Sequence, residues 1–119
     1  MMRLTIDRLH IEAEPKLTAY IDEKIGKLDH LLSRHARKSA HAGVKLKAGP
    51  GRGKKQFTCE VIIHLPSEVV TTNQTAESPN AAVDLVEAKL KNQLKKYKDK
   101  HTLRRRRRVR QFLGRVRRR

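Results

Sequence analysis

Residues 57–75, FTCEVIIHLPSEVVTTNQT, decide the fold because they predict two strands joined by a turn. In the first half of this stretch every second residue is apolar: Phe57, Cys59, Val61, Ile63 and Leu65. A period of two is that of a strand with one buried face. Pro66 and Ser67 supply the turn, and a β-branched run over residues 69–75 predicts the next strand.

Two helices are predicted from apolar residues at helical spacing. The first begins at Pro15 and covers residues 15–33, and the second follows the hairpin and ends at about residue 101. Ser78 has the residue type of an N-cap for the second helix, and Pro79 suits its first helical position. Each helix has a single apolar face, so each is expected to pack against a sheet.

Two further strands are predicted ahead of the hairpin. Residues 38–47 alternate, with Val44 and Leu46 among the apolar positions. Residues 3–11 also alternate, but their apolar phase shifts after Ile6, which a β-bulge would explain.

The resulting order, β-α-β-β-β-α, predicts an α+β fold. A strand, a helix and a neighbouring strand suggest a right-handed crossover, after which the remaining strands form a meander. The two helices are expected to pack side by side on one face of a four-stranded sheet. We expect residues 1–101 to form this domain and residues 102–119 to form an arginine-rich C-terminal tail.

The chain is strongly basic, with 29 basic and 12 acidic residues among 119 and a formal net charge of +17. Ten of the basic residues are arginines in residues 104–119, which contain no acid. Residues 1–103 therefore keep 19 basic and 12 acidic residues and are basic too. A field of this sign attracts nucleic acid, an acidic membrane surface or an acidic protein. The sequence has no apolar run of about 18 residues, no recognisable secretory signal and one cysteine, so we expect a cytoplasmic protein.

No motif for catalysis or metal binding emerges. The loop GPGRGK, residues 49–54, resembles a phosphate-binding Walker loop, but it is one residue short and leads into a strand. A hairpin loop that touches RNA phosphate is the better interpretation. Cys59 fits a small core residue better than a nucleophile, and the histidines lack metal-ligand spacing. We therefore expect no enzyme, metal, cofactor or small-molecule substrate.

The C-terminal half of the second helix is rich in lysine and contains one acid, Asp99. Its six lysines are Lys89, Lys91, Lys95, Lys96, Lys98 and Lys100. A solvated face, with cations favoured at a helix C-terminus, is the ordinary interpretation. The same helix begins with Asp84 and Glu87, however. This charge gradient favours a phosphate-binding end.

Basic residues elsewhere complete the candidate RNA-binding set. They are Lys24, Lys27 and Arg34 near the first helix; Arg52, Lys54 and Lys55 in the loop; and Arg104, Arg105, Arg106, Arg107, Arg108, Arg110, Arg115, Arg117, Arg118 and Arg119 in the tail. The tail also carries apolar residues at helical spacing, and the second helix could run on into it. Because five adjacent arginines repel one another, we predict that the tail is disordered until it binds RNA or another polyanion.

Three segments resemble the family of ribosome hibernation-promoting factors and ribosome-associated inhibitors, also called ribosomal subunit interface proteins. They are MRLTIDRLHIE, TAYIDEKIGKLDHLLSR and TAESPNAAVDLVEAKLKNQLKKYKDKH. The resemblance covers about residues 2–101 and implies a fold similar to double-stranded RNA-binding domains. It also implies docking on the small ribosomal subunit, in the cleft where messenger and transfer RNAs pass. By resemblance, rRNA contacts fall on Lys24, Lys27, Arg34, Lys89, Lys96, Lys98 and Lys100.

Long members of that family carry a second domain that pairs two ribosomes, and residues 102–119 could not fold into one, so we expect no dedicated dimerisation domain. The sequence thus predicts a non-enzymatic translation inhibitor that occupies the decoding cleft and sterically blocks mRNA and tRNA. A general RNA- or DNA-binding protein, ribosomal or nucleoid in type, is the first alternative. A membrane-surface protein built on an amphipathic tail is the second, although we expect no membrane partner.

Overall fold

The computed structural model describes residues 2–11, 14–50 and 55–117, the last of these from residue 101 onward by backbone only. Its strands are β1 (Arg3–Leu9), β2 (His41–Pro50), β3 (Lys55–Leu65) and β4 (Glu68–Ala76). Its helical elements are α1 (Pro15–Ile21), a π-helical segment η1 (Asp22–Gly26), a 3-10 segment η2 (Lys27–Leu31), α2 (Arg34–Ser39) and α3 (Pro79–Arg117).

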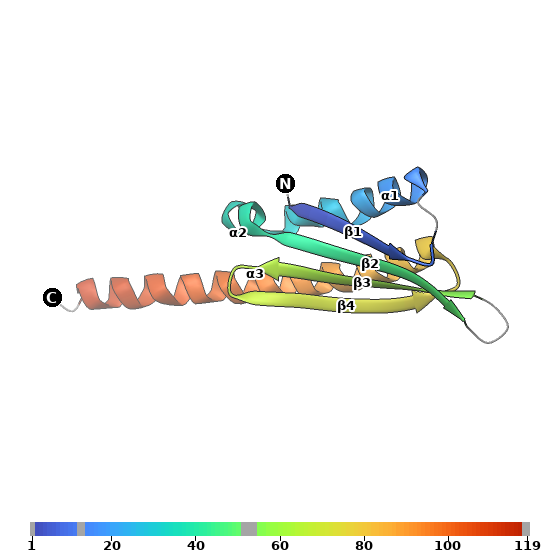
Figure 1. Ribbon diagram of the computed structural model, residues 1–119. Helices are drawn as coiled ribbons and strands as arrows, with labels where there is room; N and C mark the ends of the chain where they lie inside the picture. Colours follow the sequence, from blue (N-terminus) through green and yellow to red (C-terminus); the bar gives the residue numbers. More distant parts are fainter. Residues whose placement is uncertain (1, 12–13, 51–54, 118–119) are drawn as a thin grey trace.

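The four strands form one sheet in the order β1-β2-β3-β4 (Figure 1). β1 and β2 are parallel, as a crossover through a helix requires, and the other two pairs are antiparallel. The α+β fold class and the order of the strands are therefore confirmed. The predicted hairpin is β3 and β4, in which Leu65 pairs with Glu68 across the turn.

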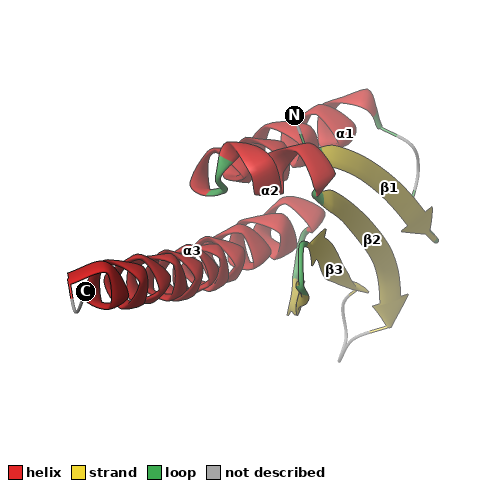
Figure 2. Ribbon diagram, turned by 90° about the vertical axis from the view of Figure 1, so that its left-hand side faces the viewer, coloured by secondary structure: helices red, strands yellow, loops and turns green. Residues whose placement is uncertain are grey.

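The core lies between this sheet and the helices, which cover one of its faces and leave the other open (Figure 2). Ile21, Ile25 and Leu28 reach it from the first helical region, and Leu90 and Leu94 reach it from α3. Alternate residues of the central strands meet them, and the most deeply buried are Val44, Leu46, Cys59, Val61 and Ile63. Burying their side chains contributes most of the stabilisation, at about 25 cal/mol per Å² of apolar surface.

The first helical region is not the single helix predicted for residues 15–33. An α-helix has 3.6 residues per turn, so residues four apart drift around its axis by about 40°. Ile21, Ile25 and Leu28 are nonetheless all fully buried. The chain passes from α-helical to wider π-helical and then tighter 3-10 winding. This change of winding keeps the three apolar side chains facing the sheet.

A separate short helix follows, and it changes the place of Arg34. Leu32 is extended, and the Ser33 hydroxyl accepts a hydrogen bond from the Ala36 amide at 3.2 Å. Ser33 is thus an N-cap, and Arg34 is the first residue of α2 rather than part of the first helix. Because α2 extends to Ser39, β2 begins at His41, later than the predicted residue 38.

The first strand is shorter than predicted and has no bulge within its paired length. β1 pairs residue by residue with β2, from Arg3 opposite His41 to Leu9 opposite Lys47. The shifted apolar phase simply puts Leu9 on the open face, where it is half exposed. The strand ends there because His10 adopts a left-handed backbone conformation, with φ of 61°.

The last helix begins as predicted and ends later. The Ala81 amide donates to the Ser78 hydroxyl at 3.1 Å, so Ser78 is the N-cap. The predicted end near residue 101 is wrong, because α3 continues to Arg117 and projects past the sheet (Figure 1). The helix therefore crosses the expected boundary between domain and tail. Disorder of residues 102–119 before RNA binds stays a prediction about the chain in solution.

Candidate nucleic-acid interface

The lysines of α3 lie outside its buried stripe, on the flanks and the outer side of the helix. Val86, Leu90, Leu94 and Tyr97 are buried against the strands and form the inner side of the helix. The lysines fall between these buried positions in the sequence. Lys91 is half-buried, and the five exposed lysines are Lys89, Lys95, Lys96, Lys98 and Lys100. The core-facing spacing thus leaves the cations in solvent, where they can meet phosphate.

Lys24 contacts other residues of the fold, because it lies in the seam between the first helical region and α3. Its Nζ is 4.0 Å from Oε2 of Glu87 and 5.6 Å from the centre of the Tyr20 ring. Oε2 of Glu87 is buried and accepts no hydrogen bond from the described residues. A buried carboxylate without a cation is costly. Lys24 therefore balances the charge of Glu87 in the seam.

Tyr20 joins the same two helices by a hydrogen bond. Its hydroxyl donates to the Asp84 carboxylate on α3. That hydrogen bond, with smaller contributions from desolvation and neighbouring carboxylates, raises the pKa of Tyr20 to about 12. The acids that open α3 thus serve the packing of the helices. Their separation from the lysines at the other end has a structural cause as well as an electrostatic effect.

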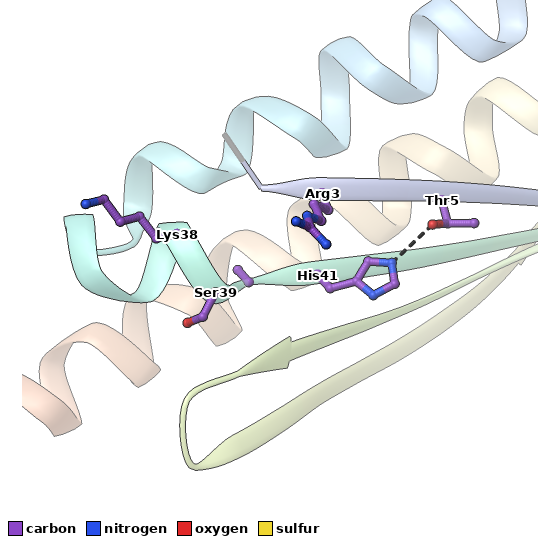
Figure 3. Close-up of a pocket in the computed structure, with 6 residues that line it drawn as sticks. Arg3, Thr5, Lys38, Ser39 and His41 are labelled. Atoms are coloured by element: carbon purple, nitrogen blue, oxygen red, sulfur yellow. Dashed lines mark hydrogen bonds between the residues drawn. The ribbon is translucent and has the colours of Figure 1, made fainter.

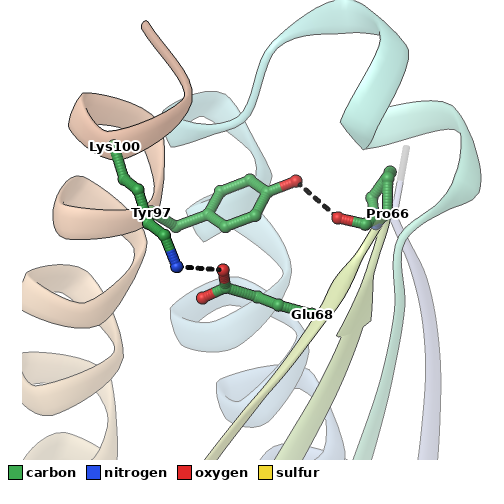
Figure 4. Close-up of polar contacts among 4 residues, drawn as sticks. All are labelled: Pro66, Glu68, Tyr97 and Lys100. Carbon is green, nitrogen blue, oxygen red and sulfur yellow. Dashed lines mark hydrogen bonds and ion pairs between the residues drawn. The ribbon is translucent and has the colours of Figure 1, made fainter. Parts of the chain in front are cut away.

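Lys100 is anchored to the turn between β3 and β4 (Figure 4). Its Nζ lies 3.5 Å from a carboxylate oxygen of Glu68, and the neighbouring Tyr97 hydroxyl donates to the Pro66 carbonyl at 3.1 Å. Burial raises the pKa of Tyr97, with a smaller contribution from Glu68. An exposed ion pair of this kind contributes little, about 0–1 kcal/mol. Lys100 can therefore exchange Glu68 for a phosphate.

The other predicted residues are spread over the surface. Lys27 in η2, Arg34 in α2 and Lys55 at the start of β3 are exposed. Arg52 and Lys54 lie outside the described residues, as do Arg118 and Arg119. The backbone of α3 carries the remaining tail arginines away from the sheet. The structure thus groups the α3 lysines most closely and leaves Lys55, at the start of β3, at the opposite end of the sheet (Figure 1).

The structure agrees with the expectation that Cys59 is a core residue. Its side chain is fully buried, and burial raises the pKa of its thiol to about 12. No group of three potential metal ligands occurs among the residues the structure describes. Within the same residues, no helix is long and apolar enough to cross a membrane.

Sequence reasoning missed the basic residues of the open sheet face, and Arg37 and Lys38 of α2. Arg37 holds the end of η2, because its guanidinium donates to the carbonyls of Asp29 and Leu32 at 3.2 and 3.4 Å. Arg3, His41 and Lys45 alternate with buried residues along β1 and β2. The period of two in these strands was the signal that could have placed them on one face.

Two solved structures share this fold. The Thermus thermophilus Protein Y N-terminal domain matches with a TM-score of 0.68 and 20% identity, covering 82% of this chain and 99% of that structure. A ribosomal subunit interface protein from Coxiella burnetii matches with a TM-score of 0.65 and 18% identity over 82% of this chain and 99% of that structure. At these identities the likeness establishes the fold class.

Sequence comparison gives the family. The chain belongs to the Sigma 54 modulation protein / S30EA ribosomal protein family, whose model matches residues 4–102. The ribosome hibernation promoting factor of Pseudomonas putida is 30% identical over 99 residues, covering 83% of this chain and 89% of the relative. That of Lactococcus lactis is 26% identical over 98 residues, covering 82% of this chain. The chain spans 50% of that relative and 33% of a chloroplast ribosome-binding factor from spinach.

Proposed function

We propose that this protein is a hibernation factor that binds the small ribosomal subunit through its rRNA, occupies the decoding cleft and excludes mRNA and tRNA. The cationic side of α3 carries this proposal. Five exposed lysines lie on the outer side and flanks of a helix whose inner side is fixed in the core. The relatives are named as ribosome-binding and ribosome hibernation factors, which supports ribosomal RNA as the ligand of these lysines. The proposed site of action is the cytoplasm.

The mechanism is steric and requires no catalysis. Each phosphate that a lysine neutralises releases counterions, so affinity should fall as the salt concentration rises. For each phosphate contact, the logarithm of the affinity should fall by about 0.7–0.9 per tenfold increase in salt concentration. Such contacts carry no sequence information. The rigid outline of sheet and helices is what can select a cleft by shape. In this proposal the arginines beyond the domain add affinity, and the folded domain supplies the choice of site.

Neutralising α3 tests the proposal. The variant Lys89→Gln/Lys96→Gln/Lys98→Gln should bind isolated small subunits more weakly and lose translation inhibition, because three phosphate contacts are removed. Its salt slope should fall by about 2–3 units. Co-sedimentation over a salt series measures both quantities.

The matched control is Lys16→Gln/Lys45→Gln/Lys47→Gln, which removes the same charge from three exposed lysines outside the lysine-rich half of α3. It should change binding far less. Equal losses in the two variants would show that net charge alone drives binding, and the general nucleic-acid binder would then be the better account.

A further inference from the structure

A second basic site lies at the end of the sheet where β1 and β2 begin (Figure 3). It is a pocket of about 500 Å³ lined by Arg3, Thr5, Lys38, Ser39, Ala40 and His41. Its residues come from the open sheet face and from the end of α2, not from the lysines of α3. The function proposed above leaves it unused.

The backbone brings the basic groups of the pocket together. The Arg3 amide donates to the Ala40 carbonyl at 3.2 Å, which joins the start of β1 to the link between α2 and β2. The parallel register then sets Arg3 directly beside His41. Because neighbouring strands are about 4.8 Å apart, the two side chains rise from the same patch of the open face.

The charge of this patch is not balanced by acids. One cross-strand row of the open face contains Arg3, His41 and His64, and the two imidazole rings stack with centroids 6.2 Å apart. A row further along alternates in sign instead, with Lys45 between Asp7 and Glu60. The row that opens into the pocket therefore carries the Arg3 cation with no carboxylate beside it.

The hydrogen-bonding groups suit an anion. The polar side chains of the lining are two basic groups, two hydroxyls and one imidazole, and the lining includes no carboxylate. Among the described residues, neither Arg3 nor Lys38 takes part in an ion pair. Nε2 of His41 is 3.1 Å from the Thr5 hydroxyl. When Thr5 donates to Nε2, Nδ1 carries the proton and is left as a donor.

The flexible member of the pocket is Lys38. Figure 3 shows its stem on α2 and its ammonium turned away from Arg3. A lysine side chain is a flexible four-carbon stem, so Lys38 can swing towards a bound anion, whereas Arg37 beside it is fixed on backbone carbonyls. The site thus has one donor held in place, His41, and two cationic side chains on either side of it, Arg3 and Lys38.

We propose that this pocket binds a phosphate group, held by the Arg3 guanidinium and His41 and closed over by Lys38. A guanidinium offers paired N–H donors that match the spacing of phosphate oxygens. The phosphate can be a diester of an RNA backbone or a terminal phosphate of a small molecule, since the recognising chemistry is the same. The inference is independent of ribosome binding, because it concerns other residues on another face.

Titration of the full chain with inorganic phosphate, followed by amide NMR at fixed pH and ionic strength, tests the site. The amides of Arg3 and residues 39–41 should shift along a saturable curve. Arg3→Gln should weaken binding about tenfold, because one charge-assisted hydrogen-bond pair is lost. Lys45→Gln removes an equal charge from the same face and should leave the curve within about twofold of the parent.

A second titration with a short single-stranded RNA distinguishes the sources. If RNA shifts the same amides and displaces phosphate, the ligand is a backbone diester; if only phosphate shifts them, the ligand is a small phosphate-bearing molecule. Either result supports the pocket. Shifts that do not saturate, or that Arg3→Gln and Lys45→Gln reduce equally while both remain folded by circular dichroism, overturn it.

Discussion

At the scale of single residues, the seam between the first helical region and α3 separates a lysine that holds the fold, Lys24, from one that is exposed, Lys27. Lys24 and Lys27 are one helical turn apart and were predicted to have the same role. The structure places Lys24 beside a buried oxygen of Glu87 and leaves Lys27 exposed. Exposure follows from how the helices pack, so spacing in the sequence could not separate these two lysines.

Lys24→Met should therefore destabilise the protein, by about 1 kcal/mol, because it leaves the Glu87 carboxylate without its cation. Lys27→Met, the matched control, should be close to neutral. Urea denaturation measures both free energies of unfolding. Adding Glu87→Gln to Lys24→Met should recover part of the loss, and a double variant no more stable than the single one would contradict the assigned role.

The Tyr20 hydroxyl reports on the same seam. Its hydrogen bond to Asp84 is the main cause of its raised pKa, so Asp84→Ala should lower that pKa from about 12 towards 10. A pKa raised by folding stabilises the protein below pH 10, and this contribution is lost as the pH rises towards 12. At about pH 11, absorbance should show a largely protonated Tyr20 in the parent and a largely ionised one in the variant. Identical titrations would contradict this account.

At the scale of elements, local signals located helix starts better than helix ends. Ser78 and Pro79 gave the start of α3, and Ser33 has the same capping chemistry but was hidden inside a run of helical spacing. The end of α3 was misplaced because the sequence near residue 101 contains no signal that ends a helix. No Gly or Pro lies between Pro79 and Gly114. The change to π and 3-10 winding keeps Ile21, Ile25 and Leu28 buried against the sheet. Such packing depends on the shape of the sheet, so no local pattern in the sequence predicts it.

The cap of α3 can be tested directly. Ser78→Ala removes the hydroxyl that accepts from the Ala81 amide and should lower the free energy of unfolding by about 1 kcal/mol. Ser78→Asp keeps an acceptor and adds a favourable charge at the helix N-terminus, so it should retain the parent stability. Thermal and urea unfolding followed by circular dichroism compare the two. Equal losses would show that the capping bond contributes nothing.

At the scale of the whole molecule, a two-layer fold separates charge. The sheet and the inner sides of the helices bury most of the apolar residues, and the exposed sides of α3 carry lysines. Alternation and helical spacing predicted these layers from sequence, because burial sets both periods. The pocket at Arg3 and His41 could not be predicted in that way. It depends on which ends of two strands meet α2.

The core residues described extend no further along the chain than Tyr97, so the domain should fold without residues 104–119. The central claim is that this folded body, rather than its arginines, recognises the small ribosomal subunit. Co-sedimentation of a chain ending at residue 103 with isolated small subunits, in excess duplex RNA at about 0.15 M salt, tests it most directly. We predict binding that the competitor leaves largely intact. Complete loss of binding to the competitor, from a chain that is still folded, would contradict the claim.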